Sequence, residues 1–366
     1  MKKNLAALEL HHLLKELNIL IDGKVDKVYQ FGKKEFLFQF HLRNRGKKLL
    51  KISLPNFIYL TDKKEASEKN YGFCSFLRKY LNNSILKDTK QIDFERVIEL
   101  HFQSKESLIL IIELFSKGNI VLCKENYEII MPLETQLWKN RKIKKGLRYK
   151  SPESKTNFLK LEEKELSNLL KETDKDKIVT FLAIDLGLGG IYSEELCLNS
   201  NINKDKKPAD LEEKDIKNLF DEIRKIQNKK LDPQIIYDDK NNIIDILPFG
   251  LNYYKNYQIK KTKNYNESLD QIPLKIKKSR NEIEIEKINE IIEKQRIHIE
   301  EIKKDIEEND KKAELIYTKY GLIKNIIGEL NEISKRHSWQ EIKKKLESHK
   351  IIKEVNPKEK TIVVEI

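Results

Sequence analysis

Three glycines, Gly187, Gly189 and Gly190, fall within four positions of the stretch LGLGG, in a chain that has only 12 glycines in 366 residues. The cluster separates two apolar stretches, so the sequence predicts a turn between two helices. Glycine lets such a turn take left-handed conformations and leaves its amide groups uncovered. Those donors and the dipole of the second helix favour a phosphate group. The alternative is a glycine that ends one helix before a short connection.

A second candidate phosphate site is the basic stretch KIKKGLRYK at 142–150. Its cations lie around one glycine and one tyrosine, and they are Lys142, Lys144, Lys145, Arg148 and Lys150. Grouped lysines and arginines neutralise a phosphate backbone whatever its base sequence. The alternative is a solvated basic loop.

Glu95 and Arg96 are adjacent in the stretch DFERVIEL. On an expected strand they should point to opposite faces of the sheet. The simplest interpretation of the residues alone is two solvated charges on a strand edge. The planar guanidinium of an arginine can also bind a phosphate with two hydrogen bonds or stack on a base.

The overall charge favours a polyanionic partner. The chain has 72 Lys and Arg against 59 Asp and Glu, a net charge of +13 and a pI near 9.2. Nucleic acid, a ribosome or an anionic membrane would suit that balance. A general Lys- and Ile-rich composition explains it equally well.

The cysteines and the first residues favour a cytoplasmic chain without a metal or other cofactor. Cys74, Cys123 and Cys197 lie far apart and follow no ligand or disulfide spacing. Charged and histidine residues interrupt the apolar residues of the first segment, so no signal peptide is expected. No apolar run is long enough to span a membrane, so no membrane partner is expected.

The periodicity of apolar residues predicts a chain of several parts. A helix at 4–18, alternating strands, a helix at 70–83 and further strands indicate an α+β unit built on a β-sandwich. A helical block then interrupts this unit, and strands resume after it. The predicted parts are 1–160, first part of the β-sandwich domain; 161–230, helix-hairpin-helix domain; 231–275, return segment; 276–335, coiled-coil arm helix; and 336–366, start of a further domain.

The arm helix carries a heptad seam, in which apolar spacings of three and four alternate without a slip from Ile285 to Leu330. Gln295 and Asn309 break the seam and would set its register. One helix of this length would measure roughly 70 Å. The alternative is a single amphipathic surface helix. No partner helix follows, so we expect either a fragment of a longer protein or a dimer through the coiled coil.

Several stretches in this order resemble the NFACT family, the NEMF, RqcH and fibronectin-binding-protein-A type of ribosome quality control factor. They are LEL, KVDKVYQ, CSFLRKYLNN, FERVIEL, LIIELFSKGNIVLC, KGLRYKSP, LGLGGIYSEELC and YNESLDQ, followed by the heptad helix and SWQEIKKKL. Each stretch is weak alone, but the ordered set is specific and covers nearly the whole chain.

The resemblance implies an N-terminal domain similar in fold to formamidopyrimidine-DNA glycosylases, then a helix-hairpin-helix domain and a coiled-coil arm. It implies binding to obstructed large ribosomal subunits that carry peptidyl-tRNA. It also implies recruitment of aminoacyl-tRNA, alanyl-tRNA above all, for a template-free tail. The ribosome makes the peptide bonds, so the chain itself is not expected to be an enzyme. The C-terminal domain of the family is not among these residues.

The resemblance also implies site residues, with two departures. Glu95 and Arg96 occupy the position of an Asp-Arg pair that the family needs for tailing, and Glu9 that of an Asp near the N-terminus. Both replacements keep the charge and add one methylene, which displaces a hydrogen bond to a positioned group. Tailing is therefore less firmly expected than ribosome binding.

Three other functions compete with ribosome quality control. A DNA glycosylase of the same fold class would start with Pro-Glu and end in a zinc finger, whereas this chain starts with Met1-Lys2-Lys3 and its cysteines are scattered. A surface adhesin would need an export signal. An RNA-binding coiled-coil protein without tailing activity fits the Glu replacements.

Overall fold

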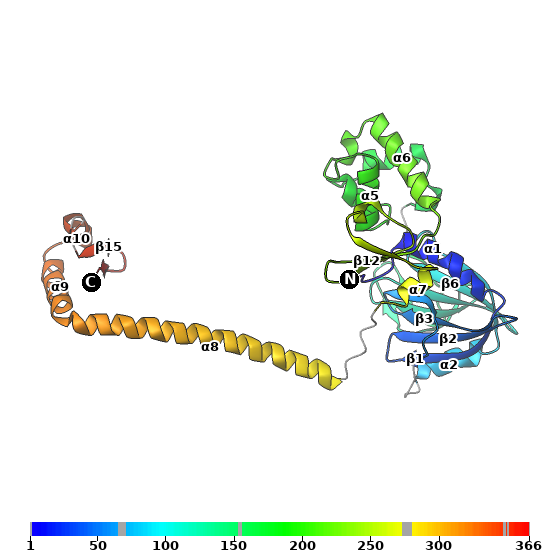
Figure 1. Cartoon of the computed structure of the whole chain (residues 1–366), viewed down its shortest axis with the longest axis horizontal. Helices are drawn as coiled ribbons and strands as arrows, with labels where there is room; N and C mark the ends of the chain where they lie inside the picture. The colour runs from blue at the N-terminus through cyan, green and yellow to red at the C-terminus, as the bar shows by residue number, and fades with distance from the viewer. Residues whose placement is uncertain are drawn as a thin grey trace. The chain divides into compact units, whose positions relative to one another are not determined.

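The structure, a computed structural model, describes residues 2–64, 71–152, 156–272, 280–346, 349 and 351–365. The chain divides into two compact units, Met1–Leu274 and Lys275–Ile366 (Figure 1). No helix in the described ranges is long and apolar enough to cross a membrane.

Unit 1 is built on one nine-stranded antiparallel sheet, in the order β4-β3-β2-β1-β5-β6-β7-β8-β9. The strands are β1 Lys24–Phe31, β2 Glu35–Leu42, β3 Gly46–Ser53, β4 Phe57–Thr61, β5 Ile85–Gln91, β6 Val97–Gln103, β7 Ser107–Glu113, β8 Asn119–Lys124 and β9 Ile129–Pro132. A hairpin of β10 Gln136–Leu137 and β11 Lys142–Ile143 follows.

The sheet folds over its own core. Its halves join along a short stretch around the pair of Lys24 on β1 and Ile85 on β5. The rings of Phe40 on β2 and Phe102 on β6 stack with centroids 6.4 Å apart. Three strand spacings of a flat sheet would separate them by roughly 14 Å. The expected sandwich is therefore one sheet whose two halves face each other, rather than two separate sheets.

Helices close this core. Helix α1 (Ala7–Leu17) buries Leu10, Leu13 and Leu17 at helical spacing, and α2 (Gly72–Leu81) buries Leu77 and Leu81. Burial of such an apolar stripe, more than local propensity, stabilises short helices of this kind.

A second core belongs to the helical block. Its helices are α3 Glu163–Glu172, α4 Ile178–Ile184, α5 Gly190–Asn199 and α6 Glu213–Gln227. Leu166, Phe181, Leu196 and Leu219, one from each helix, meet in it. The short 3-10 helices of unit 1 are η1 Asn18–Leu20, η2 Phe158–Lys160, η3 Pro208–Asp210 and η4 Asn252–Tyr254.

The return segment lies between the two cores (Figure 1). It forms a sheet in the order β13-β12-β14, with β12 Gln234–Tyr237, β13 Ile243–Leu247 and β14 Gln258–Lys261, and then α7 Tyr265–Leu269. Ile235 and Ile246 pack into the first core, whereas their neighbours Ile236 and Leu247 pack into the second. Strand alternation thus joins the β part to the helical block.

Unit 2 contains α8 Arg280–Thr318, α9 Tyr320–Ser334, α10 Trp339–Leu346, β15 Ile352–Asn356 and β16 Thr361–Val364. After α9 the chain forms a short helix, a strand, a turn and a second strand that pairs with the first. The prediction of one helix from Ile285 to Leu330 is wrong, because the helix breaks at Lys319, whose φ and ψ are −103° and 17°. Gly321 follows two residues later, and glycine lowers the stability of a continuous helix.

Candidate nucleic-acid interface

Glu95 and Arg96 lie in a tight loop at 92–96 that joins β5 to β6, and the prediction of a strand there is wrong. The amide of Glu95 donates to Ile92 O (2.7 Å). Asp93 and Phe94 have φ of 43° and 59°. Phe94 is buried against Phe158, 4.8 Å between ring centroids. Packing of this one ring turns the chain and ends the strand early.

The backbone of this loop is fixed from two sides. The carbonyl of Arg96 accepts from Leu114 N (2.8 Å). The side chain of Gln91 donates to the carbonyls of Ala7 and Glu95, both at 2.9 Å, and so ties the start of α1 to the loop.

The Arg96 guanidinium is half-buried, and among the described residues it makes no hydrogen bond or salt bridge. Burial lowers the pKa of this group, against an opposing effect of the neighbouring Glu95. Even so it stays charged near neutral pH, because a guanidinium ionises far above that range. A cation on a fixed backbone with unused donors is suited to a phosphate or a base edge.

Glu9 does not line this surface. Its carboxylate is only 2 % exposed. It accepts from Lys2 Nζ (2.7 Å), Tyr192 Oη (2.9 Å) and Ala6 N (2.8 Å), and Lys2 also pairs with Asp245 at 2.8 Å. Burial raises the pKa of the Glu9 carboxyl, and the charge of Lys2 opposes that shift. Glu9 therefore touches only its own chain here, and a direct contact with tRNA does not fit its position.

The glycine cluster forms the turn between α4 and α5, as predicted. Gly187 and Gly189 have φ of 69° and 76°, and a Cβ atom on either would meet nothing within 4 Å. Among the described residues, no side chain caps the start of α5. Within the described chain the amides of Gly190 and Ile191 have no acceptor. These donors and the helix dipole make a suitable phosphate site.

Tyr192, in the first turn of α5, connects this turn to Glu9. The glycine turn, α1 and the loop at 92–96 are therefore joined by hydrogen bonds.

The basic stretch at 142–150 is a well-anchored loop. Lys142, Lys144, Lys145 and Arg148 are exposed. The hydroxyl of Tyr149 donates to Glu113 (2.9 Å), which also pairs with Arg141. The amide of Gly146, whose φ is 82°, donates to Ile129 O at 2.8 Å. The loop holds its cations outward on a fixed backbone.

A pocket of about 450 Å³ brings this loop and the loop at 92–96 together, and we name it the Glu99 pocket. It is lined by Ile92, Glu99, Tyr127, Arg148, Tyr149, Lys150 and Ser151. Sequence reasoning found its cations but missed Glu99 and Tyr127. Glu99 alternates along β6 like any strand residue, and the turn that carries Tyr127 has no distinctive residue pattern.

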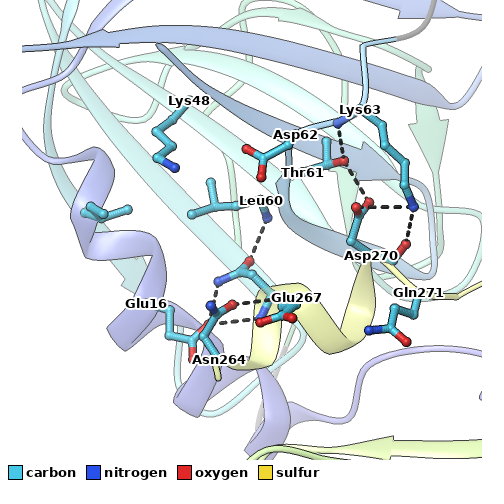
Figure 2. Close-up of a pocket in the computed structure, with 12 residues that line it drawn as sticks. Glu16, Lys48, Leu60, Thr61, Asp62, Lys63, Asn264, Glu267, Asp270 and Gln271 are labelled. Carbon is cyan, nitrogen blue, oxygen red and sulfur yellow. Dashed lines mark hydrogen bonds and ion pairs between the residues drawn. The ribbon is translucent and has the colours of Figure 1, made fainter. Parts of the chain in front are cut away.

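A larger pocket of about 660 Å³ lies by α1, β4 and α7 (Figure 2). Its polar groups are largely used within the fold. Glu16 accepts from the amides of Tyr265 (2.8 Å) and Asn266 (3.0 Å), and Asp270 accepts from Thr61 Oγ1 (2.7 Å). These hydrogen bonds hold the return segment against α1 and the sheet. No group of His, Cys, Asp and Glu in the described ranges could hold a metal ion.

Comparison with protein families matches residues 7–364 to the family described as NFACT N-terminal and middle domains. This chain belongs to that family. The Rqc2 homologue aRqcH of Methanocaldococcus jannaschii is 31% identical over 96% of this chain and 55% of the relative. The human ribosome quality control complex subunit NEMF is 27% identical over 62% of this chain and 22% of the relative. The chain thus spans about half the length of the archaeal relative and a smaller part of the human one.

Solved structures agree with the fold. The fibrinogen binding protein from Staphylococcus aureus has a TM-score of 0.59 and 22% identity, over 73% of this chain and 97% of that chain. The N-terminal part of the fibronectin/fibrinogen-binding protein from Streptococcus suis has a TM-score of 0.58. The Lactococcus lactis Fpg protein in complex with DNA reaches a TM-score of only 0.32, and the expected likeness to glycosylases stays a prediction.

Proposed function

We propose that this NFACT chain acts in ribosome-associated quality control. On this proposal it binds obstructed large ribosomal subunits that carry peptidyl-tRNA, and it recruits aminoacyl-tRNA, alanyl-tRNA above all, for template-free tailing. The observation that carries the proposal is the similarity to the archaeal Rqc2 homologue, which extends over 96% of this chain. The chain positions tRNA in the cytoplasm, and the ribosome supplies the chemistry.

Three surfaces would hold RNA in this proposal. Arg96 contacts tRNA through the unused donors of its guanidinium. The basic loop at 142–150 and the turn between α4 and α5 hold phosphates, so that α4 and α5 work as a helix-hairpin-helix element. Helix α8 forms a coiled coil. Glu9 supports the loop that carries Arg96 and the turn between α4 and α5 from inside the fold.

The test is a substitution of Arg96. Arg96→Ala should leave the melting temperature nearly unchanged, because the guanidinium makes no hydrogen bond or salt bridge in the described chain. It should abolish aminoacyl-tRNA recruitment and tailing on obstructed subunits in vitro. Arg45→Ala, which removes an exposed arginine from another loop, is the matched control. Normal tailing by Arg96→Ala would exclude this role of the residue.

An RNA-binding function without tailing is the second candidate, because Glu95 and Glu9 stand where the family usually has Asp. Glu95→Asp distinguishes the two candidates in the same assay. A gain in tailing would show that the added methylene weakens the reaction. Co-sedimentation with large subunits and no tailing by any of these proteins would favour the second candidate.

A further inference from the structure

The Glu99 pocket combines a buried acceptor with exposed cations. Glu99 is 4 % exposed. Its Oε2 is hydrogen-bonded to His101 Nε2 (2.8 Å) and Tyr127 Oη (3.2 Å), whereas its Oε1 has no such partner among the described residues. Arg148 and Lys150 are exposed at the rim, and neither has a salt bridge within the described chain. The interior therefore accepts a hydrogen bond, and the rim attracts an anion.

Tyr127 is held in an uncommon conformation at this pocket. Its φ is 65°, a value that bulky residues rarely adopt. Two backbone hydrogen bonds maintain it, from Tyr127 N to Lys124 O (2.9 Å) and from Tyr149 N to Tyr127 O (2.8 Å). Such strain persists only where the surroundings fix it, and it often accompanies a binding site. The hydrogen bond to Glu99 keeps the Tyr127 side chain at the pocket.

We propose that the Glu99 pocket binds one nucleotide of an RNA strand, with a base that carries an exocyclic amino group. The amino group donates to Glu99, the base lies against the ring of Tyr127, and Arg148 and Lys150 hold the adjoining phosphates. The inference rests on the proposed RNA-binding function and adds a subsite to it. A volume of about 450 Å³ is within the usual range for a small-ligand pocket.

The charges select this ligand over others. An acidic peptide would bring a carboxylate towards Glu99, and a basic peptide would meet Arg148 and Lys150. A nucleotide offers a neutral donor at one end and an anion at the other. Carboxylates accept from the amino group of cytosine. Uracil has one ring N–H, and the carbonyl oxygens on both sides of it would repel the Glu99 carboxylate.

The experiment measures fluorescence anisotropy of labelled hexaribonucleotides of cytidine, adenosine and uridine with the full chain. The wild-type protein should bind the cytidine and adenosine strands about fivefold or more tightly than the uridine strand. Glu99→Gln, which keeps the shape and removes the charge, should abolish that preference. Arg148→Ala should weaken all three strands and lower the salt dependence by roughly one phosphate contact.

Matched variants control for net charge and folding. Glu106→Gln, in the exposed turn after β6, should keep the base preference, and Arg45→Ala should keep more of the affinity than Arg148→Ala. If Glu99→Gln does not fold, Tyr127→Leu replaces it and should weaken all three strands through lost stacking.

Equal binding of the three strands by the wild-type protein, or an unchanged preference in a folded Glu99→Gln protein, would overturn the inference. Normal binding by Tyr127→Leu, where that variant is needed, would overturn it as well. Co-sedimentation with large subunits in either case would leave the proposed function standing, since that function needs no base preference here.

Discussion

At the scale of single residues, Glu9 shows what a sequence can and cannot tell. The family resemblance singles it out as an acid near the N-terminus. Nothing in the sequence shows that it is buried, because Tyr192, which donates to it, and Asp245, which shares Lys2 with it, come from distant parts of the chain. Its position suits a support for the glycine turn and the loop at 92–96 better than a contact with RNA.

His12, one turn beyond Glu9 on α1, should make stability depend on pH. It is fully buried, and neither ring nitrogen has a hydrogen-bond partner among the described residues. Burial lowers its pKa to about 3, with smaller effects of Lys15 and His11. Between about pH 6.5 and pH 3, His12 is therefore protonated in the unfolded chain and neutral in the folded chain. The stability that His12 contributes is complete above about pH 6.5 and falls as the pH is lowered through this window.

His12→Leu should remove this dependence, by at most about 1.4 kcal/mol per pH unit. It should not destabilise the protein near pH 7, since no hydrogen bond of the ring is lost. Calorimetric unfolding between pH 7 and pH 4 measures both effects, and His41→Leu at an exposed position is the control. If the free energy of unfolding falls equally with decreasing pH in the wild-type and His12→Leu proteins, His12 accepts a proton in the folded chain and the prediction is wrong.

At the scale of elements, the periodicity of apolar residues predicts those helices and strands that form by burying one face. The amphipathic helices, the alternating strands of the sheet and the helical block all follow from an apolar face that must be covered. The short loop at 92–96 could not be predicted, because one ring, that of Phe94, packs into another core and ends the strand. The break at Lys319 could not be predicted either, because the spacing of apolar side chains does not show the φ and ψ angles of the backbone.

The candidate site was predictable only in pieces. The glycine turn and the cations of the basic loop have local patterns, and the structure places them as exposed turns. The Glu99 pocket forms where β6, the turn at Tyr127 and the loop at 148–151 come together in the fold. No spacing along the chain encodes a meeting of three segments.

The glycine turn offers a test without backbone strain at Gly190. Its φ is not among the positive values, and a Cβ atom there would meet nothing within 4 Å. Gly190→Asp should fold at least as stably, because an acid suits a helix N-terminus. It should nevertheless weaken RNA binding about five- to tenfold by repelling phosphate.

Gly72→Asp is the matched control for this variant. It adds the same charge at the start of α2, where a Cβ atom also has open space. Filter binding of tRNA at several salt concentrations compares the two. Equal affinities of the two variants would remove the glycine turn from the RNA interface.

At the scale of the whole molecule, the two compact units present different surfaces. Unit 1 packs most of its apolar side chains into three cores, and the return segment contributes to two of them. Unit 2 does not. The described seam residues Ile299, Ile302 and Ile306 of α8 are 52%, 43% and 53% exposed. Contiguous apolar surface of this kind marks an interaction site.

We therefore expect this chain to form dimers through α8 at micromolar concentrations. The regular heptad spacing of the seam fits knobs-into-holes packing against a second copy. Ile299→Glu with Ile306→Glu places charges in the seam and should give monomers. Lys304→Glu with Lys311→Glu changes charge on the opposite side of the heptad and should keep the dimer. Light scattering over a concentration series measures both. A wild-type monomer with full helicity that binds no apolar dye would contradict this expectation, because such a seam would be exposed without any tendency to associate.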